Sequence, residues 1–477
     1  MAIRAAAVVV PFVGERSLII ERAATLSFQP GFHSYPGGRI DASDRRPGGP
    51  PGAPMGAAWA ALRELVEELG VGPGLSQEII DKIRSDEFFP EDVDVDWSRW
   101  RYLGVWTTPA YAGQRFETHF FSCRLDAETE PSPNDEVARA RWLSAAAVEA
   151  EWRAGELLAS PPVLAACNAT FSGGTIHRDG DARDLLCAGG PVRYLPLETP
   201  TLPPASHTNC AFLRTKNGLY AVDPAAVAAT ERALLWRHVE ALAEGGEPLV
   251  GVIISHLHHD HIGAASWLAE RAGVPILASR RTAEDLRGGH GASISAGGFR
   301  LDAAPVVTDL LAEGDELGGG WTVLETPGHA WGHLCFRHAE SRSLVAGDMI
   351  AGGSTILIEP GQGDLKIYVE SLQRLADLEP RFVLPSHGMP FAVGAAALRA
   401  LIAHRLKREA KTVGRLERLG PCSLEALLAS VYDDTPRVAW PMAELSLMSH
   451  LHKLRVEGRA RQDGEGRWLV DAGAGAT

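Results

Sequence analysis

Residues 255–263 read Ser-His-Leu-His-His-Asp-His-Ile-Gly, and this stretch decides the fold of the chain. It follows residues 249–254, Leu-Val-Gly-Val-Ile-Ile, an apolar run typical of a strand buried on both faces. A helical pattern comes next, through Trp267 and Leu268. Four histidines and one aspartate therefore lie in a strand-to-helix loop. Imidazole and carboxylate groups held by such a scaffold are suited to zinc or a similar divalent ion.

The spacing within this loop predicts how its side chains divide. His256 and His258 are two residues apart, so in extended backbone both leave the chain on the same side. Asp260 and His261 are adjacent and point differently, so one segment can serve two metal ions a few ångströms apart. We expect His259 to face away from the site as a loop histidine, or to serve only in packing.

Length and composition exclude several classes of protein. At 477 residues the chain is too long for one core, which predicts two to four domains. Its net charge of -14 argues against a surface that is basic all over for nucleic acid. Six scattered cysteines suit a reducing cytosol, and no apolar segment is long enough to span a membrane. We expect a cytoplasmic protein with no membrane partner.

The N-terminal third carries an acidic helix. A Pro/Gly-rich loop at residues 45–54 excludes a helix, and residues 57–69 then predict one. Glu64, Glu67 and Glu68 stand at i, i+3 and i+4, so they share one helix face. Two interpretations fit this face: a solvated acidic surface, or a site for a magnesium ion that holds a diphosphate.

Two segments resemble the halves of the Nudix box. Arg63-Glu64-Leu65-x-Glu67-Glu68-x-Gly70-Val71 is similar to the second half, and Gly38 with Asp44 resembles the first, with Asp for the usual Glu. The Pro/Gly loop interrupts the box, as in the Nudix coenzyme A diphosphatases. The resemblance covers roughly residues 5–170 and implies a Nudix fold with Mg or Mn. It assigns metal binding to Glu67 and Glu68, and catalysis of diphosphate cleavage to Glu64, Glu67 and Glu68.

Three further apolar strands are each followed by one polar side chain. The strands predicted at residues 321–325, 343–346 and 382–384 precede His329, Asp348 and His387. In a layered α/β fold such strand ends converge on one edge, where sites usually form. The recurrence of this pattern after the histidine-rich loop predicts that these residues share its site.

This ordered set closely resembles the metallo-β-lactamase superfamily over roughly residues 190–395. The resemblance implies an αββα sandwich holding two zinc ions, or iron or manganese in their place. A bridging aspartate and no cysteine ligand make the set similar to glyoxalase II and to nucleases. His333 is left out, because it falls on the next strand. The implied roles are His256, His258 and His329 on one metal; Asp260, His261 and His387 on the other; Asp348 bridging both; and Asp223 orienting the ligands from outside.

The C-terminal tail resembles a winged helix. We expect one helix from His404, two more at residues 423–432 and 443–457, and a hairpin around residues 463–466. The tail is similar to that of the β-lactamase-like protein 2 branch, whose known member cuts single-stranded RNA. The basic first helix predicts phosphate contacts; the alternative is a solvated face that packs the tail on the hydrolase domain. The candidate nucleic-acid residues are Arg405, Lys407 and Arg408.

The predicted fold class is α/β and α+β multidomain. It comprises a Nudix α/β/α sandwich, then a metallo-β-lactamase αββα sandwich, then a small winged-helix domain. The predicted ranges are 1–172 for the Nudix-like domain, 173–190 for a linker, 191–400 for the metallo-β-lactamase domain, 401–472 for the winged helix and 473–477 for a disordered tail.

Three functional hypotheses follow. The first is a hydrolase of a small thioester or ester, of acyl-CoA or glutathione type, in which a zinc-bridged hydroxide attacks and Asp260 passes the proton. A coenzyme A derivative would then suit the Nudix part. The alternative is an endoribonuclease acting on single-stranded RNA, with the Nudix part as a binding module. A third hypothesis makes the Nudix part a binder with a decayed site. The sequence gives no oligomeric state.

Overall fold

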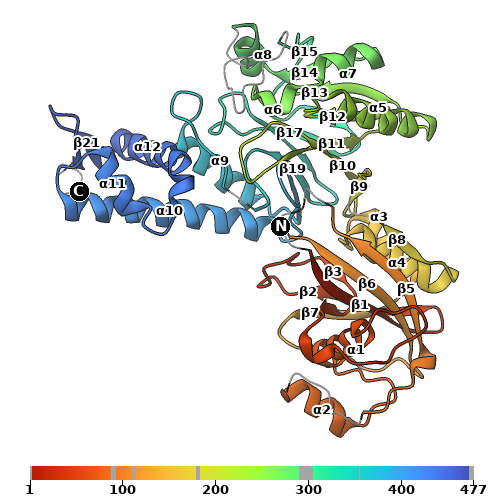
Figure 1. The fold of residues 1–477 in the computed structure, drawn as a ribbon. Helices are drawn as coiled ribbons and strands as arrows, with labels where there is room; N and C mark the ends of the chain where they lie inside the picture. Colours follow the sequence, from red (N-terminus) through yellow and green to blue (C-terminus); the bar gives the residue numbers. More distant parts are fainter. Residues whose placement is uncertain are drawn as a thin grey trace. The chain divides into compact units, whose positions relative to one another are not determined.

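The computed structural model describes residues 3–86, 93–109, 112, 114–178, 183–288, 304–353 and 355–471. The chain divides into two compact units, Met1–Pro196 with Phe391–Val393 and Leu197–Pro390 with Gly394–Thr477 (Figure 1). The predicted disordered tail at 473–477 lies outside the described residues. Each unit is taken by itself below.

The first unit is built on a mixed eight-stranded sheet. Strands β1 and β6 pair in parallel, whereas β1 pairs antiparallel with β2 and with β4. The path of the sheet is β3 (His33–Ser34), β2 (Arg16–Arg22), β1 (Arg4–Val13), β6 (Phe116–Arg124), β5 (Trp100–Thr107) and β8 (Ile176–Arg178), with β4 (Gly37–Arg39) on β1 and β7 (Val137–Ser144) on β2.

Two cores form because successive side chains of a strand face opposite sides of the sheet. Val9, Leu18 and Ile20 join the core beneath α1 (Ala57–Leu69). Val10 and Ile19 face the other core, against α3 (Ala145–Ala154) and α4 (Pro161–Ser172). The sandwich of helix, sheet and helix predicted for a Nudix domain is confirmed. The remaining elements are η1 (Ala42–Asp44), α2 (Gln77–Asp86) and η2 (Trp97–Arg99).

The segment predicted as a linker, 173–190, contains regular structure. Strand β8 pairs in parallel with β5, and β9 (Leu186–Cys187) pairs antiparallel with β10 (Val192–Glu198). A short strand that completes a sheet draws its stability from its neighbour, so its own composition gives no signal. Residues 179–182 of this segment lie outside the described residues.

The second unit begins with two sheets covered by helices. Figure 1 shows α5 (Ala229–Glu244) and α7 (Ala265–Ala272) on one side of the sheets and α9 (Leu365–Asp377) on the other. This arrangement confirms the predicted αββα sandwich. In the first sheet the strands that lie wholly in this unit run β15 (Asp309–Leu311), β14 (Ile276–Ser279), β13 (Leu249–Ile253), β12 (Leu219–Val222) and β11 (His207–Arg214). The second sheet runs β16 (Glu316–Gly318), β17 (Trp321–Glu325), β18 (Leu334–His338), β19 (Ser343–Gly347) and β20 (Phe382–Pro385).

The tail of the second unit is the predicted winged helix. Its core is built from apolar residues of all three helices and of the wing, among them Leu416, Leu427, Leu451 and Trp468. Ser423 caps the second helix, where its hydroxyl accepts a hydrogen bond from the Ala426 amide. The elements are α10 (Gly394–Leu419), α11 (Leu424–Val431), η4 (Arg437–Ala439), α12 (Trp440–Val456), β21 (Ala460–Gln462) and β22 (Trp468–Val470).

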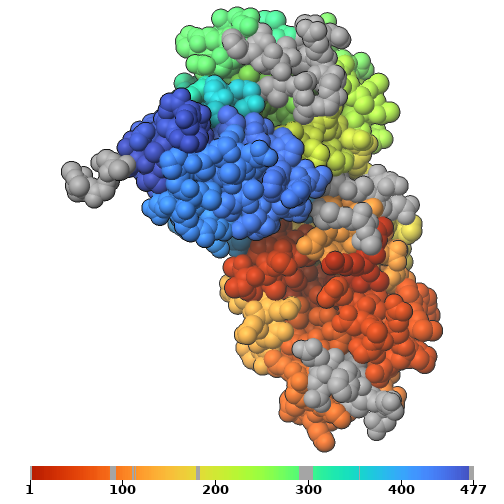
Figure 2. All heavy atoms as spheres, turned by 60° about the vertical axis from the view of Figure 1, so that its left-hand side comes forward, coloured from red at the N-terminus to blue at the C-terminus, as the bar shows by residue number. Residues whose placement is uncertain are grey.

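The first tail helix begins ten residues before the predicted start at His404, because α10 opens at Gly394. Its first turns bury Ala395, Leu398 and Ile402, and α10 packs against α9 of the hydrolase sandwich. In the space-filling view the blue tail adjoins the cyan part of the same unit (Figure 2). The tail is therefore fastened to the hydrolase fold by a continuous helix.

The cysteines and the hydropathy agree with the sequence analysis. All six cysteines are free thiols; five are buried and Cys187 is partly exposed. Among the described residues, no helix combines the length and the apolar character needed to cross a bilayer.

Candidate functional site

The ends of several strands bring the predicted ligands of the second unit to one edge. Strand β13 leads into the histidine loop, where α6 (His259–Ile262) begins directly after His258. Strands β17, β19 and β20 run in the same direction, because β17 and β19 are both antiparallel to β18 and β20 is parallel to β19. Their carboxyl ends therefore deliver His329, Asp348 and His387 beside the loop.

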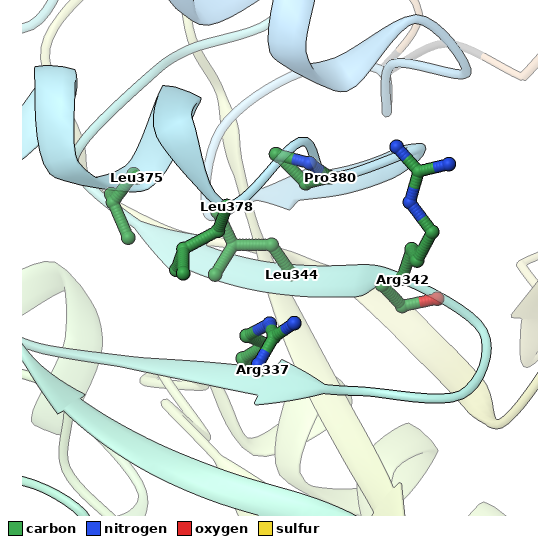
Figure 3. A pocket seen from close by; sticks show the side chains of 7 residues that line it. Arg337, Arg342, Leu344, Leu375, Leu378 and Pro380 are labelled. Atoms are coloured by element: carbon green, nitrogen blue, oxygen red, sulfur yellow. The ribbon is translucent and has the colours of Figure 1, made fainter.

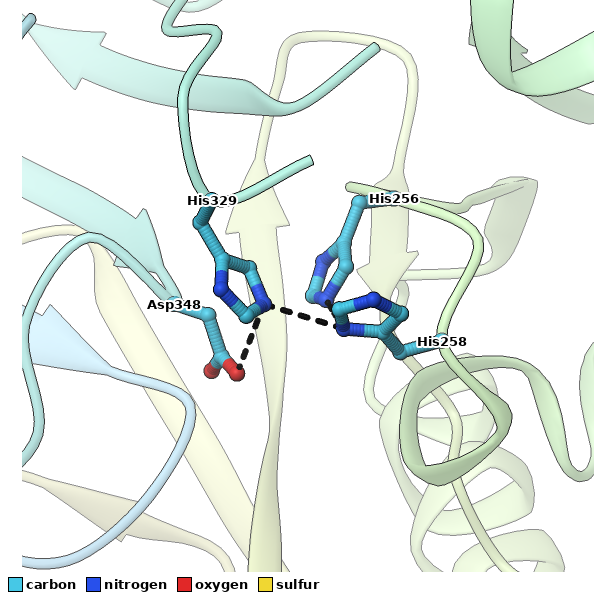
Figure 4. A group of neighbouring side chains, drawn as sticks. All are labelled: His256, His258, His329 and Asp348. Atoms are coloured by element: carbon cyan, nitrogen blue, oxygen red, sulfur yellow. Dashed lines mark hydrogen bonds and ion pairs between the residues drawn. The ribbon is translucent and has the colours of Figure 1, made fainter. Parts of the chain in front are cut away.

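Four of the imidazole rings, those of His256, His258, His329 and His387, are oriented so that each presents a nitrogen without a hydrogen to the centre. His329 Nδ1 donates to the Leu357 carbonyl at 2.9 Å, and His387 Nδ1 donates to the His207 carbonyl at 3.0 Å. A carbonyl oxygen can only accept, so Nε2 of each ring is left as the inward lone pair. Figure 4 shows His256, His258, His329 and Asp348 converging in this way.

Two further rings follow the same rule. Ser255 Oγ donates to Asp223 Oδ2 at 2.6 Å and lies 2.9 Å from His256 Nδ1, so the serine oxygen accepts from that nitrogen. His258 is turned over: its Nε2 donates to Gln362 Oε1 at 3.3 Å, which leaves Nδ1 facing inward. His258 Nδ1 then lies 3.0 Å from both His256 Nε2 and His329 Nε2. Three nitrogen lone pairs thus face one another without a hydrogen between them.

The two carboxylates lie between the rings. Asp348 Oδ2 is 3.4 Å from His329 Nε2 and 3.6 Å from His261 Nε2, and Asp348 Oδ1 is 3.4 Å from His387 Nε2. Asp260 lies 3.6 Å from His387 Nε2 and 3.8 Å from His261 Nε2. Asp348 therefore contacts the ligand groups on both sides, as the predicted bridging residue should.

The electrostatics of this buried cluster favour an added positive charge. Burial, reinforced by neighbouring imidazoles, lowers the pKa of His256 well below its usual value and that of His258 to about 3. Burial also opposes protonation of His261, yet the carboxylates of Asp348 and Asp223 outweigh it and raise the His261 pKa well above its usual value. The neutral imidazoles of His256 and His258, beside the charged carboxylate of Asp348, attract a cation.

These residues fit a pair of divalent ions. Two ligands about 2.1 Å from a tetrahedral zinc ion lie about 3.4 Å apart, which is the range of separations seen here. Among the described residues, His261 Nε2 and Asp348 Oδ1 are buried without a hydrogen-bond partner, and both face the cluster. The side chains gather in two main groups, His256, His258, His329 and Asp348, and Asp260, His261 and His387.

Asp223 holds the ligand loop from behind. Its Oδ1 accepts from the Ser255 amide at 2.8 Å, and its Oδ2 accepts from His261 Nδ1 at 2.9 Å. Asp223 has a left-handed backbone with φ of 53°, which turns the chain at the end of β12. His333 also stays outside the cluster: its Nε2 accepts from the Asp348 amide at 3.1 Å. Both residues orient ligands.

Two residues that the sequence analysis did not name hold the chain beside the ligands, and one of them connects the two sheets. Asn209 Nδ2 donates to the carbonyls of Pro385 and Gly388, on either side of His387. Thr208 Oγ1 donates to the Asp260 carbonyl at 2.9 Å. Both lie in β11, and both contacts span more than fifty residues of sequence, so spacing alone gave no signal. His259 packs elsewhere, with Nε2 donating to the Pro200 carbonyl.

In the first unit, Arg63 lies at the centre of the acidic helix face. Its Nε donates to Asp44 Oδ1 at 3.0 Å, and its Nη1 donates to Glu64 Oε1 at 3.0 Å and to Glu67 Oε2 at 2.9 Å. A further bond from Nη2 reaches the Arg39 carbonyl. Asp44 and Arg63 thus meet although the Pro/Gly loop separates them in sequence. The sequence analysis quoted Arg63 only as part of the motif.

The three glutamates of this helix have different surroundings. Burial raises the pKa of Glu64 to about 7 although Arg63 opposes the shift, and burial raises the pKa of Glu68 well above its usual value. The Gly37 amide donates to Glu68 Oε2 at 3.3 Å. Gly38 leaves room for the Glu64 carboxylate in its present position, because a Cβ there would lie 2.2 Å from Glu64 Oε1. The carboxylate oxygens suit Mg or Mn, so the residues present fit such an ion.

The structure removes Arg405 and Arg408 from the predicted set of surface phosphate contacts. Arg405 is 5% exposed and donates to the Ile356 carbonyl. Arg408 donates to the Val431 carbonyl at 2.8 Å and to Asp434 at 3.0 Å. Only Lys407 of the three points to solvent. The prediction was wrong for the two arginines because α10 packs on its neighbours through the face that carries them.

A crevice between the second sheet and α9 is no alternative site. It encloses about 10 Å³. Figure 3 shows Leu344, Leu375 and Leu378 among the side chains that line it. That volume holds one water molecule at most. A thioester, a nucleotide or any other organic substrate is too large for it.

Comparisons with known proteins agree with the geometry. The family models for the NUDIX domain, the metallo-beta-lactamase superfamily and the beta-lactamase associated winged helix domain match residues 2–160, 203–387 and 423–468. A beta-lactamase-like protein 2 homolog of Drosophila melanogaster is 30% identical over 223 residues, 44% of this chain and 70% of that protein. The lactamase-like protein adaB of Aspergillus niger is 26% identical over 50% of this chain and 75% of its own length. A hydroxyacylglutathione hydrolase of Rhizobium meliloti is 31% identical over 23% of this chain and 36% of its own length.

Proposed function

Because the chain belongs to the metallo-β-lactamase superfamily, with a Nudix domain before the hydrolase domain and a winged helix after it, we propose that its central site hydrolyses a small thioester or ester. The observation that carries the proposal is the set of inward-facing imidazole nitrogens around Asp348. Lone pairs that face one another in a buried site repel unless a cation lies among them. Such a set is suited to holding two divalent ions, beside which the acyl bond of a substrate can be hydrolysed.

The chain's own residues divide the work of the reaction. When bound, two ions would supply a Lewis acid and lower the pKa of water to near neutral. His256, His258 and His329 would hold one ion, Asp260, His261 and His387 would hold the other, and Asp348 would lie between them. Burial alone would raise the pKa of Asp260, but His261 and His387 lower it below its usual value. Asp260 therefore stays ionised and accepts a proton at its carboxylate.

A small thioester is favoured over other acyl substrates by two observations. One relative in the comparison is named a hydroxyacylglutathione hydrolase, whose name states a glutathione thioester as its substrate. The attached Nudix domain belongs to a hydrolase family whose resemblance here is to coenzyme A diphosphatases. Both favour a thioester substrate formed from a thiol metabolite, of acyl-glutathione or acyl-CoA type.

The test is metal content together with a paired activity screen. The purified protein is assayed on p-nitrophenyl esters, acyl-CoA and acyl-glutathione thioesters and a fluorescent single-stranded RNA, alongside His258→Ala and the control His404→Ala. His404 is exposed on α10, so its removal should change nothing. We expect about two metal ions per chain and thioester turnover that only His258→Ala abolishes. Robust RNA cleavage without thioester turnover contradicts the proposal.

A second candidate is an endoribonuclease acting on single-stranded RNA. The winged-helix domain after the hydrolase domain favours it, because such domains often bind nucleic acid. Lys407 is the member of the predicted basic set that is still available for phosphate. RNA binding that falls steeply with salt and weakens in Lys407→Gln would support this candidate.

For the first unit we propose a Mg- or Mn-dependent diphosphatase site on Glu64, Glu67 and Glu68. It is supported by the carboxylate oxygens gathered on one helix face and by Gly38, whose missing side chain lets Glu64 approach. The test is cleavage of coenzyme A or ADP-ribose with Mg, and its loss in Glu67→Gln. If the wild type binds these compounds but cleaves none of them, the domain is a binding module.

A further inference from the structure

The winged-helix tail touches the metal cluster through one short segment. Residues 356–358, called here the bracing segment, lie between the two and belong to no helix or strand. The Leu357 carbonyl accepts from His329 Nδ1 at 2.9 Å. The carbonyls of Ile356 and Ile358 face the other way, toward the tail.

Two tail residues take these outward carbonyls. Arg405 of α10 donates to the Ile356 carbonyl, and Ser449 of α12 donates through its hydroxyl to the Ile358 carbonyl. Both are buried, Arg405 at 5% and Ser449 at 4% exposure. Arg405 also lies over the ring of Tyr368, 5.6 Å from its centroid. The middle carbonyl of the bracing segment thus accepts from the ligand His329, and the tail holds the carbonyl on either side of it.

The surrounding contacts support the same arrangement. Tyr368 donates from its hydroxyl to the Met349 carbonyl at 2.7 Å, one residue after Asp348. His452 of α12 lies 3.7 Å from Asp364, whose amide donates to the Gly328 carbonyl next to His329. The chain directly before His329 and directly after Asp348 is therefore held through residues that contact the tail.

We propose that Arg405 and Ser449 are positioning residues for the metal ligand His329, so that the winged helix keeps the metal in place. They act through the bracing segment and do not touch substrate. The inference rests on the proposed metal site. A ligating imidazole needs its outer nitrogen held to fix the ring, and loss of such a partner costs about 10- to 100-fold in metal affinity.

The variants are Ser449→Ala and the matched control Thr412→Val. Thr412 also makes a hydroxyl bond within its helix, to the Arg408 carbonyl at 2.9 Å, and it is fully buried. Its hydroxyl has no contact with the bracing segment among the described residues. Each variant loses a hydroxyl bond to the carbonyl four residues earlier in its own helix, since the Ser449 hydroxyl also lies 3.0 Å from the Leu445 carbonyl. Only Ser449→Ala also loses the bond to the Ile358 carbonyl. Arg405→Lys, which keeps the charge but loses the planar fork, gives a second variant.

The readout is the release of zinc from the full-length protein to a colorimetric chelator. We expect two phases in the wild type, and we expect Ser449→Ala and Arg405→Lys to speed one phase about 10-fold while the other keeps its rate. Thr412→Val should release both ions at the wild-type rates. Circular dichroism checks that each variant is folded, since a general loosening of the domain would speed both phases.

The outcomes separate the inference from the proposed function. A wild type that holds two ions and variants that release them at unchanged rates overturn the positioning role and leave the metal site standing. Equal acceleration of both phases, in the control as well, also overturns it. A wild type that binds no divalent ion removes the proposed function and the inference together.

A second observation, away from the metal cluster, concerns a hollow of about 420 Å³ between α5 and α7. Trp236 and Trp267 line it, with ring centroids 6.4 Å apart and planes at 80°. The guanidinium group of Arg271 lies 4.4 Å from the Trp236 centroid. The Nε1 atom of Trp236 is buried there with no hydrogen-bond partner among the described residues.

The side chains that line this hollow are mainly positive, whereas the chain as a whole is negative. Three arginines and one glutamate line it, Arg232, Arg237, Arg271 and Glu240, while the whole chain carries -14. Arg232 is tied to the carbonyls of Ala226 and Gly263. In the described part of the chain, Arg237 and Arg271 make no ion pair with a carboxylate. Indole rings stack with flat groups, and the Arg271 guanidinium already lies over both of them. A base would extend this stack, and the guanidinium groups of Arg237 and Arg271, which lack a carboxylate partner in that part of the chain, accept a phosphate.

We infer that this hollow binds one nucleotide, with its base against the tryptophans and its phosphates on Arg237 and Arg271. Its size is that of a small-molecule pocket, not of a groove for a strand. The probe is ADP, titrated calorimetrically with chelator present so that neither proposed metal site contributes. We expect Trp236→Leu and Arg271→Gln each to weaken binding at least about 10-fold, and the exposed control Arg280→Gln to bind as the wild type does.

Three results overturn the nucleotide site: no binding of ADP, binding that survives Trp236→Leu unchanged, or inorganic phosphate that binds as tightly as ADP. The same titration is then repeated with an adenine oligoribonucleotide in place of ADP. If it binds about 100-fold more tightly than ADP and loses that advantage in Trp236→Leu, the occupant is a strand and the single-nucleotide assignment is wrong.

Discussion

The acidic helix face of the first unit and the histidine cluster of the second differ in the origin of their positive charge. In the first, Arg63 donates to Asp44, Glu64 and Glu67, so the fold supplies its own cation. In the second, within the described residues, neither Asp260 nor Asp348 is paired with a lysine or an arginine. We therefore expect the second site to depend on a cation from solution, and the first to keep its geometry without one.

The largest effect should come from Asp348→Asn, which tests the dependence on outside cations. Asp348 contacts ligands on both sides, so the change should weaken both metals and lower thioester turnover by about 10⁴-fold, taking about 10²-fold for each ion. Metal analysis and steady-state kinetics measure it. Asp377→Asn, an exposed carboxylate on α9, is the control and should match the wild type. If the Asp348→Asn protein still held two ions, Asp348 would not be needed for metal binding, and the contrast between the two sites would fail.

The next effect should come from Arg63→Met, which tests the internal cation. Its removal leaves Asp44 buried at 1% exposure without its partner, so the free energy of unfolding of the first unit should fall by about 3–5 kcal/mol. Calorimetry of the full chain measures the transition. In the control, Arg153→Met, an exposed pair with Glu149 is lost, which should cost less than about 1 kcal/mol. Equal losses in the two variants would show that Arg63 is an ordinary surface partner.

A smaller effect is expected for Asp223→Asn. Asp223 orients His261 and the Ser255 amide but does not face the cluster centre. We expect a drop in metal affinity of about 10- to 100-fold on the His261 side, with the fold intact. Competition with a chelator of known affinity measures it. Loss of both ions together would mean that Asp223 supports the whole loop and not one ligand.

The smallest effect concerns a second internal cation, Lys453, in the tail. Lys453 lies 2.7 Å from Glu409 and 2.8 Å from Glu457, and Arg459 lies 3.1 Å from Glu457. Burial raises the pKa of Glu457, but the bonds from Lys453 and Arg459 outweigh it and hold that pKa below its usual value. A depressed carboxyl pKa stabilises the fold above its unfolded value, near about pH 4.5, and this contribution is lost as the pH falls further.

We therefore expect the wild type to lose up to about 1 kcal/mol more than Glu457→Gln does between about pH 5 and about pH 3, where the unfolded chain binds a proton at Glu457 before the folded one does. Denaturant unfolding at the two pH values measures the difference. Identical pH dependence in the two proteins would show that the carboxylate is not stabilised by its neighbours.

The histidine site could be predicted from the sequence because its ligands follow apolar strands in short, ordered motifs. The backbone of each strand end, and not a distant contact, brings them together. Helix α1 was predicted with its bounds for a similar reason, since its apolar stripe and Gly70 are local signals. Local patterns carry this information because period and capping act within a few residues.

The rest depends on contacts that cross long stretches of sequence. Nothing near Asn209 shows that it holds the carbonyls beside His387, 176 and 179 residues away in sequence. The basic run at Arg405 looks solvated until α10 is seen to pack on α9. Burial of a charged residue is decided by the partner surface, which a single sequence does not display.

The Pro/Gly loop between Asp44 and Arg63 has a consequence for how this protein can change. Closing a longer loop costs entropy only as the logarithm of its length, about 0.6 kcal/mol for each doubling. The arginine fork joins the two box halves directly, so residues between them can be added at little cost. The interrupted box is therefore a tolerant insertion point, where lineages can diverge in length and where a reporter peptide can be placed while the acidic face keeps its geometry.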